Sequence, residues 1–181
     1  MTTHFYTASS LDGFLATPDH SLHWLLEQDI DEHGPMHYSA FVEGIGALAM
    51  GASTYEWVLA HDDGPWPYSQ PTWVFTHRAL PVPAGADVRF ASGAVAPVHE
   101  AMTAAAHGKD VWLVGGGELV GQFADAGLLD QIWVQFAPVT LGAGAPLLPR
   151  ALDLEVIETA RNRSFLCGRY RVRGPLPPAG P

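Results

Sequence analysis

The feature that most constrains the fold is a repeated order of apolar stretch, glycine and helical stretch. It is clearest in "VWLVGGGELV", residues 111–120, where strand-like residues run through three consecutive glycines into a helical pattern. It recurs where "ALAM" is followed by Gly51 and "STYEWVLA". Strands that alternate with helices predict an α/β layer fold with a mostly parallel sheet. Glycines at a strand end allow positive φ and the close approach of another molecule to the main chain.

The pattern can be extended along the whole chain. Ser21 is the expected N-cap of the first helix. Two final strand-like runs lack a helix between them and indicate an antiparallel C-terminal edge. We expect strands at 4–10, 47–50, 72–76, 88–90, 111–114, 130–139, 154–161 and 165–173, and helices at 21–28, 36–45, 53–60, 96–107 and 117–127. One domain is expected over residues 1–174, followed by a disordered Pro- and Gly-rich tail at 175–181.

Composition excludes several classes of protein. With 48% hydrophobic and 15% charged residues, the chain is typical of a globular protein without membrane spans. The N-terminus shows no secretory signal, so we expect a cytoplasmic protein. Cys167 is the only cysteine, which excludes an intramolecular disulfide and a thiolate-rich zinc site. A net charge of −10 has the wrong sign for nucleic acid, so we expect a small-molecule ligand.

Polar and glycine residues follow several of the expected strands. Parallel sheets bind ligands beyond the carboxyl ends of their strands, so these residues should meet at one rim. The segments are Ser9–Gly13, Gly51–Thr54, Thr76–Arg78 and Gly115–Glu118. Free N–H groups after a glycine turn, at a helix start, form an anion site. Two such turns fit a ligand with several phosphates, and Arg78 suits a terminal phosphate monoester.

Each of these residues also has a purely structural interpretation. The glycine triplet lacks the G-x-G-x-x-G spacing and could be a tight turn. Ser53 or Thr54 could cap a helix, Arg78 could be a solvated loop charge, and Asp12-Gly is an ordinary turn pair. No metal site is expected, because Gly34-Pro35 keeps His33 and His37 from sharing a helix face. Trp24 is a core candidate that could also wall a pocket for a planar ligand.

The ordered blocks of the chain resemble a known family. "FYTASSLDGFLA", "ALAMGASTYEWV", "TWVFTHR" and "VWLVGGGELVGQFADAGLLDQIWVQFAPVTLGAGAPLLP" are similar to blocks of the dihydrofolate reductase-like superfamily. They are most similar to the branch that contains the reductase domain of bacterial riboflavin biosynthesis. The resemblance covers roughly residues 4–173, and the glycine triplet block is its most specific part.

The resemblance implies a three-layer α/β/α fold that binds NADPH and delivers a hydride to a substrate. Asp12 would face the substrate side of the nicotinamide pocket and is the candidate catalytic residue. From its place after the first loop, Trp24 is the second candidate for contact with the substrate. Ala8 would meet the nicotinamide amide, and Thr76, His77 and Arg78 would flank the adenosine ribose. The phosphates would be held by Gly51, Ser53, Thr54, Gly115, Gly116, Gly117, Glu118 and Leu119.

The chain departs from the family at two places. Relatives commonly carry a basic residue after the glycine matching Gly51, reaching the 2′-phosphate, whereas this chain has Ala52. This leaves Arg78 or His77 as substitutes and leaves NADH open as a cofactor. Folate-reducing relatives have one carboxylate on the helix after the first loop, whereas here four acidic residues crowd that stretch, namely Glu27, Asp29, Asp31 and Glu32. Folate is therefore not the expected substrate.

We therefore expect an NADPH-dependent reductase of a small heterocycle, such as a ribosylaminopyrimidine of riboflavin biosynthesis. The alternatives are a non-catalytic or regulatory dinucleotide-binding module and a hydrolase using Asp12 with a histidine. We also expect a homodimer through the C-terminal strands, with Trp133 and residues 165–173 near the contact, because a monomer has little reason to expose an aromatic there. The alternative is that Trp133 packs under a helix of the same subunit.

Overall fold

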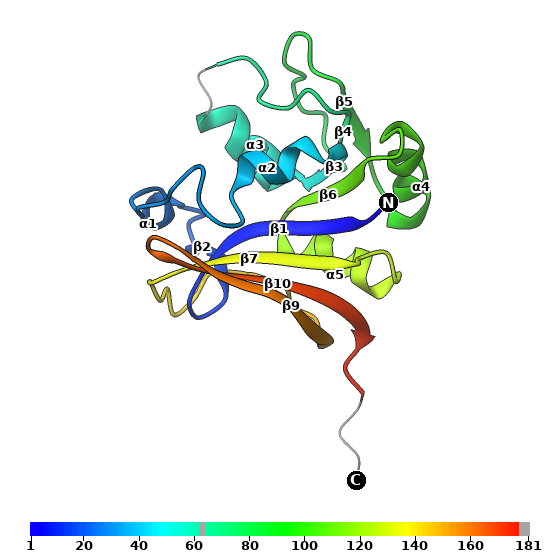
Figure 1. Cartoon of the computed structure of the whole chain (residues 1–181). Helices are drawn as coiled ribbons and strands as arrows, with labels where there is room; N and C mark the ends of the chain where they lie inside the picture. The colour runs from blue at the N-terminus through cyan, green and yellow to red at the C-terminus, as the bar shows by residue number, and fades with distance from the viewer. Residues whose placement is uncertain (62–63, 178–181) are drawn as a thin grey trace.

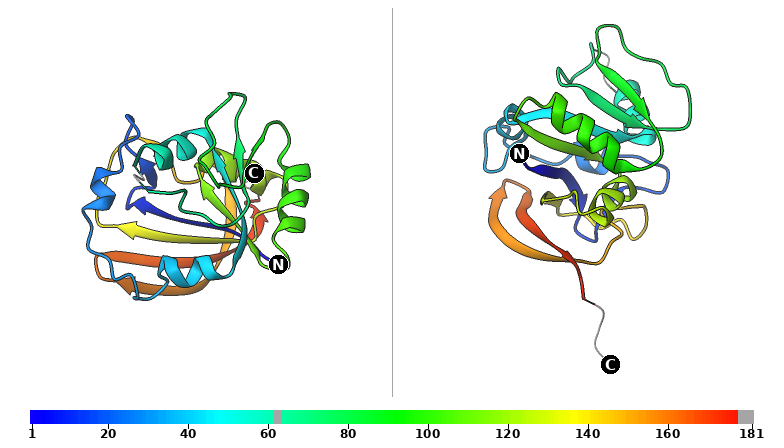
Figure 2. Two further views of the ribbon diagram at one scale, coloured as in Figure 1. Left: turned by 90° about the horizontal axis from the view of Figure 1, so that it is seen from above. Right: turned by 90° about the vertical axis from the view of Figure 1, so that its right-hand side faces the viewer.

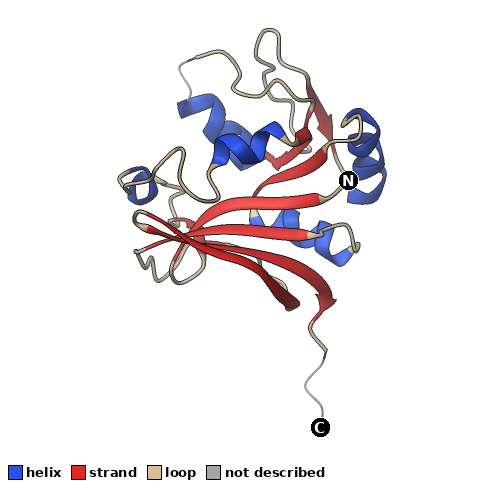
Figure 3. Cartoon of the chain, in the orientation of Figure 1, coloured by secondary structure: helices blue, strands red, loops and turns tan. Residues whose placement is uncertain are grey.

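The centre of the molecule is one twisted sheet with helices on both faces (Figures 1 and 3). The computed structural model describes residues 1–61 and 64–177. The order of the sheet is β5-β4-β3-β6-β1-β7-β10-β9. Its strands are β1 (Thr3–Ser10), β3 (Ile45–Gly51), β4 (Thr72–Phe75), β5 (Val88–Ala91), β6 (Asp110–Gly115), β7 (Gln131–Ala137), β9 (Leu152–Asn162) and β10 (Phe165–Pro175).

The first six strands of this order are parallel, and the C-terminal pair makes the antiparallel edge. β10 runs antiparallel to both β7 and β9. In Figures 1 and 2, β9 and β10 lie at the end of the molecule away from α3 (Ala52–His61) and α4 (Val95–Ala105). The expected mostly parallel sheet with an antiparallel C-terminal edge is confirmed.

Side chains along each strand point alternately to the two faces of the sheet, and so they contribute to two hydrophobic layers. Phe5 and Val111 point to the face covered by α4 and α5 (Gly117–Asp125). Their neighbours Tyr6 and Trp112 point to the other face, where Phe41 of α2 (Tyr38–Glu43) packs on them. α3 packs on that second face through Tyr55. The arrangement is therefore the expected three-layer α/β/α fold.

Some element boundaries differ from the sequence prediction. The first helix, α1, spans only His23–Leu26, and the second begins at Tyr38, where the His37 side chain accepts a hydrogen bond from the backbone N–H of Ala40. A small antiparallel pair of β2 (Phe14–Ala16) and β8 (Ala145–Pro146) was not predicted. Pairing across so many residues leaves no local signal in either segment.

The C-terminus is ordered slightly further than the expected domain end at 174. Gly174 and Pro175 still pair with β9, and the backbone N–H of Leu176 donates to the Ala151 carbonyl. Residues 178–181 of the expected tail lie outside the described residues. In the described part of the chain, no helix is long and apolar enough to cross a membrane.

Candidate dinucleotide site

The two glycine turns predicted from the sequence lie side by side. β3 and β6 are neighbours, and Met50 is paired with Gly115 at their carboxyl ends. A methyl group added at Gly51 would lie 3.9 Å from both the Gly115 carbonyl oxygen and the Gly116 nitrogen. α3 begins directly after the first turn and α5 directly after the second. Two helix N-termini, each with free N–H groups, therefore open at adjacent points of the rim.

The three glycines of the second turn have different physical reasons. Gly115 has a φ of +146°, which only glycine adopts readily. A Cβ at Gly117 would lie 2.3 Å from the Pro146 carbonyl oxygen and 2.4 Å from that of Leu147, so α5 could not approach β8 with any side chain there. A Cβ at Gly116 would meet nothing within 4 Å. Gly116 therefore leaves open space where a side chain would stand, and it gives α5 no side-chain cap.

The hydroxyls at the start of α3 are not committed elsewhere. Ser53 is exposed and Thr54 is half-buried in the first turn of the helix. Neither hydroxyl makes a hydrogen bond to another described residue. A Cβ built on Gly115 would lie 3.7 Å from Thr54 Oγ1, so this hydroxyl reaches across to the second glycine turn. The cap role that the sequence left open for these residues is not seen.

Beyond their N-terminal halves, β1 and β6 separate. Their ladder covers only Thr3–Phe5 against Val111–Leu113, although β1 continues to Ser10. The Tyr6 carbonyl accepts a hydrogen bond from the Trp112 indole, 3.1 Å away, in place of a backbone partner on β6. Ala8 therefore lies on a length of β1 that has no β6 partner among the described pairs. Diverging neighbours at the carboxyl end of an α/β sheet are the usual place for a ligand.

The segment after β4 closes the rim on the β4 side. The Arg78 backbone N–H donates to Thr76 Oγ1 at 3.0 Å, while His77 is exposed. The Arg78 guanidinium remains largely exposed, as the solvated-charge alternative supposed, but it is not unpaired: it donates to both carboxylate oxygens of Glu56 at 2.9 and 2.7 Å. This double hydrogen bond raises the pKa of Arg78 above its usual value. Sequence reasoning missed Glu56, whose partner lies 22 residues away.

Glu118 turns its side chain away from the turn. Its carboxylate accepts hydrogen bonds from Arg150 at 2.8 and 3.2 Å, which lower the pKa of Glu118. Arg150 also donates to Asp125 at 2.8 Å, about two helical turns further along α5. Leu119 is buried in the core. At these two positions, only the backbone is available for the phosphate contact predicted from the sequence.

Asp12 has an evident structural function. Its carboxylate accepts hydrogen bonds from Ser10 Oγ at 2.6 Å and from the backbone N–H groups of Leu141 and Gly142, at 3.0 and 2.7 Å. These donors lower the pKa of Asp12 to about 2. The residue is therefore ionised at neutral pH and ties the β1–β2 turn to the segment that leads into β8. An ionised carboxylate has no proton to donate, so Asp12 is poorly suited to act as a general acid on the substrate.

Trp24 packs, together with Ala8 and Met36, against the buried cluster that contains Phe165 and Cys167. Its indole Nε1 is buried and has no hydrogen-bond partner among the described residues. Burial raises the pKa of the Cys167 thiol, which keeps it neutral. Trp24 thus forms an apolar wall near the free length of β1, by which we mean residues 6–10, which pair with β7 but not with β6.

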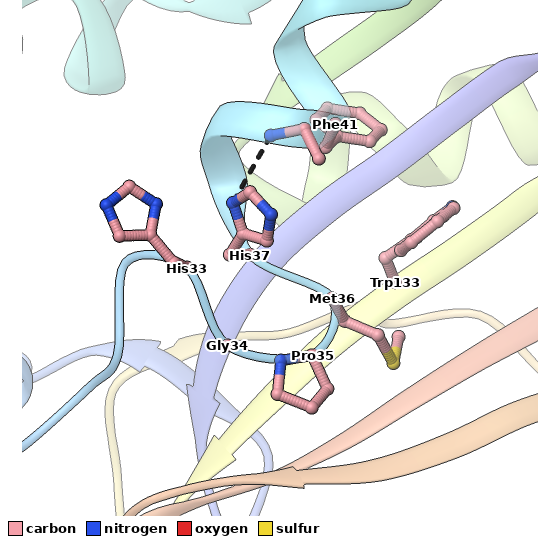
Figure 4. A pocket seen from close by; sticks show the side chains of 8 residues that line it. His33, Gly34, Pro35, Met36, His37, Phe41 and Trp133 are labelled. Atoms are coloured by element: carbon pink, nitrogen blue, oxygen red, sulfur yellow. Dashed lines mark hydrogen bonds between the residues drawn. The ribbon is translucent and has the colours of Figure 1, made fainter.

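Sequence reasoning missed an open depression of about 520 Å³ on the α2 face of the sheet (Figure 4). Loop residues 33–37, Phe41 and Trp133 line it, and none of its lining residues belongs to the glycine turns. His33 and His37 approach each other there, with ring centroids 6.2 Å apart. In the described residues, no group of three or more His, Cys, Asp or Glu side chains is placed to hold a metal ion.

Comparison with known proteins agrees with this architecture. The family model described as the RibD C-terminal domain matches residues 66–165. The chain belongs to the RibD C-terminal domain family. It is 33% identical to the protein YwjB of Bacillus subtilis over 152 residues, covering 80% of this chain and 81% of YwjB. It is 28% identical to the riboflavin biosynthesis protein RibD of Corynebacterium ammoniagenes over 171 residues, 90% of this chain but only 49% of RibD.

Solved structures give the same fold. A putative riboflavin biosynthesis protein from Shewanella superposes with a TM-score of 0.81 at 27% identity, covering 96% of this chain and 99% of that one. Dihydrofolate reductase from Enterococcus faecalis, solved in complex with NADP(H), superposes with a TM-score of 0.59 at 15% identity, covering 95% of this chain and 96% of that one. The fold is therefore shared with dihydrofolate reductase, and the family match confirms the expected riboflavin-biosynthesis branch.

Proposed function

We propose that the chain is a reductase that binds NADPH and transfers a hydride to a small heterocyclic substrate, with residues 1–174 acting as one domain. The observation that carries the proposal is the meeting of the α3 and α5 N-termini beside the free length of β1. Helix N-termini hold phosphates through N–H groups and the helix dipole. Two of them side by side match a pyrophosphate better than a single anion.

The residues of the rim fit a dinucleotide. The uncapped start of α5 leaves N–H groups without a side-chain acceptor, and the Ser53 and Thr54 hydroxyls are unused. Gly116 would leave room for the phosphates, and Thr76 with Arg78 would lie toward the adenosine ribose. Bound there, the reduced nicotinamide supplies the hydride. The protein contributes orientation and exclusion of water, with Ala8 and Trp24 bounding the nicotinamide end.

The names of the relatives suggest a pyrimidine of riboflavin biosynthesis as the substrate. RibD of C. ammoniagenes is a riboflavin biosynthesis protein, and the Shewanella protein carries a putative assignment of the same kind. This chain spans about half the length of that RibD. We therefore propose a ribosylaminopyrimidine or a similar heterocycle. Asp12 would act near the substrate by ordering its turn rather than by donating a proton.

Titration with NADPH, followed by nicotinamide fluorescence, tests the proposal. We expect saturable binding in the micromolar range and oxidation of the bound cofactor when a ribosylaminopyrimidine is added. No binding at millimolar cofactor would defeat both the reductase and the dinucleotide-binding module. Binding without oxidation of the cofactor on any pyrimidine, pterin or carbonyl compound would favour the module.

A further inference from the structure

Glu56 and Arg78 form a closed ion pair at the place where the adenosine ribose is expected. Resting on the proposed function, we propose that Glu56 determines cofactor selectivity: by occupying the Arg78 fork, it keeps the preference for a 2′-phosphate small. Both guanidinium ends donate to it, at 2.9 and 2.7 Å. The wild-type chain would therefore accept NADH nearly as well as NADPH.

The position of the pair follows from the fold. Glu56 lies in α3, one turn beyond the helix start that meets the glycine triplet. Arg78 follows β4, the strand next to β3, and its backbone is held by Thr76. The Tyr55 hydroxyl donates to the Pro81 carbonyl at 2.6 Å and so fastens the segment after β4 to α3. Glu56 and Arg78 are thus held together from both sides.

Few other cations could replace Arg78. Arg78 and Arg89 are the only Lys or Arg residues in the first 108 positions of the sequence. Ala52, at the start of α3, has no charge to offer. Arg89 is engaged by Asp87 and lies over the Trp73 ring, 4.6 Å from its centroid. The charge at the rim on the β4 side therefore depends on Arg78 and on whatever neutralises it.

The chemistry of the pair opposes a phosphate in two ways. A guanidinium fork accepts one planar or tetrahedral anion at its bidentate edge, so a 2′-phosphate must displace the carboxylate. After displacement, the Glu56 charge would remain nearby and repel the phosphate. A ribose with a free 2′-hydroxyl demands no exchange, and a carboxylate is a good acceptor for that hydroxyl.

The chain contains a matched control in Asp87 and Arg89. This pair is also exposed and bidentate, with distances of 2.9 and 2.8 Å. The Asp87 carbonyl accepts from the Thr72 backbone N–H, so Asp87 lies at the amino ends of β4 and β5, at the opposite edge of the sheet from the rim. Asp87→Asn removes the same charge as Glu56→Gln and frees an arginine in the same way.

The experiment compares dissociation constants of NADPH and NADH for wild type, Glu56→Gln, Arg78→Ala and Asp87→Asn by nicotinamide fluorescence at low salt. We expect Glu56→Gln to raise the NADPH:NADH affinity ratio by about 5- to 20-fold, the effect of removing one like charge at close range in a partly exposed site. Arg78→Ala should lower the ratio below that of wild type. Asp87→Asn should leave the ratio unchanged.

The outcomes separate this inference from the proposed function. Binding of neither cofactor to wild type would overturn both. Tight binding of both cofactors with the same ratio in wild type and Glu56→Gln would overturn the selectivity inference alone. A wild-type preference for NADPH above about 100-fold, near the full value of a charge-assisted contact, would also overturn it. Equal melting temperatures of the apo variants show that any change in ratio does not come from a loosened α3.

Discussion

Asp12 illustrates how a residue chosen for chemistry can serve architecture. It was expected near the substrate as a candidate catalytic group, and it lies in the expected turn. Its carboxylate, however, accepts from Ser10 and from two backbone N–H groups, those of Leu141 and Gly142. A charged acceptor with several donors favours the ionised form and stabilises the folded state. The sequence showed the Asp-Gly turn but not the partners, which lie 129 and 130 residues away.

Asp12→Asn should lower the melting temperature at neutral pH. An amide has only one acceptor oxygen, so its NH₂ group would face at least one of the N–H or O–H donors that now bind the carboxylate. The pKa of Asp12 is lowered from 3.8 to about 2 on folding, so its stabilising contribution is complete above about pH 4 and is lost as the pH falls from about 4 to about 2. Calorimetry from pH 7 to pH 3 should therefore show a difference between wild type and variant that shrinks only below pH 4.

The exposed Glu32 provides the comparison, and Glu32→Gln should leave the melting temperature nearly unchanged at neutral pH. A gap between wild type and Asp12→Asn that stayed constant down to pH 3 would contradict the linkage. It would mean that the charge of Asp12 does not stabilise the fold.

Arg78 shows the same gap between a chosen residue and its partner. Its place after β4 was predictable from a strand pattern, and a cation at a strand end is a local signal. Its bidentate bond to Glu56 was not predictable, because it depends on how α3 packs beside β4. The sequence therefore predicted which residues reach the rim, and the structure was needed to show which of them are already engaged.

The strand–glycine–helix turns are the elements that the sequence predicted best. Gly51 and the triplet at 115–117 both begin helices at neighbouring strand ends. Such turns can be recognised from the local sequence, because glycine marks the turn and the hydrophobic period changes from that of a strand to that of a helix. The β2–β8 pair could not be predicted, since two or three residues carry too little pattern and their pairing depends on Asp12 and the loop before β8.

Gly117→Ala should destabilise the junction of α5 with β8 by about 3 kcal/mol, because the new methyl would overlap two main-chain oxygens that cannot rotate away. Gly51→Ala adds the same methyl to the facing turn, where it would make only ordinary contacts at 3.9 Å. Urea unfolding should therefore show a large loss of unfolding free energy for Gly117→Ala and a change of less than about 1 kcal/mol for Gly51→Ala. Similar losses for the two variants would argue against tight packing at Gly117.

Across the whole molecule, the helices leave the C-terminal strands partly uncovered. Trp133 is half-buried within its own chain, where it packs on Phe41 of α2 and lies under the Arg169 guanidinium at 4.3 Å. This is the alternative that the sequence left open for Trp133. Two aliphatic side chains on the other face of the same edge are more exposed than the core allows, Leu154 at 39% and Val156 at 61%.

The homodimer stays a prediction, and we now expect its contact on that other face, because the exposed aliphatic side chains lie there. Val156 is paired with Tyr170 and Leu154 with Val172, so these side chains form one apolar surface beside a groove of about 500 Å³. Exposed aliphatic side chains in such a row are typical of an interface, and a two-fold pairing would cover the same row on both copies.

Light scattering at micromolar concentration should give twice the 19.4 kDa of one chain. Val156→Glu should reduce the mass to one chain, while Trp133→Glu should leave a folded variant dimeric. A wild-type mass of one chain would remove the dimer, and the reverse result for the two variants would return the contact to Trp133.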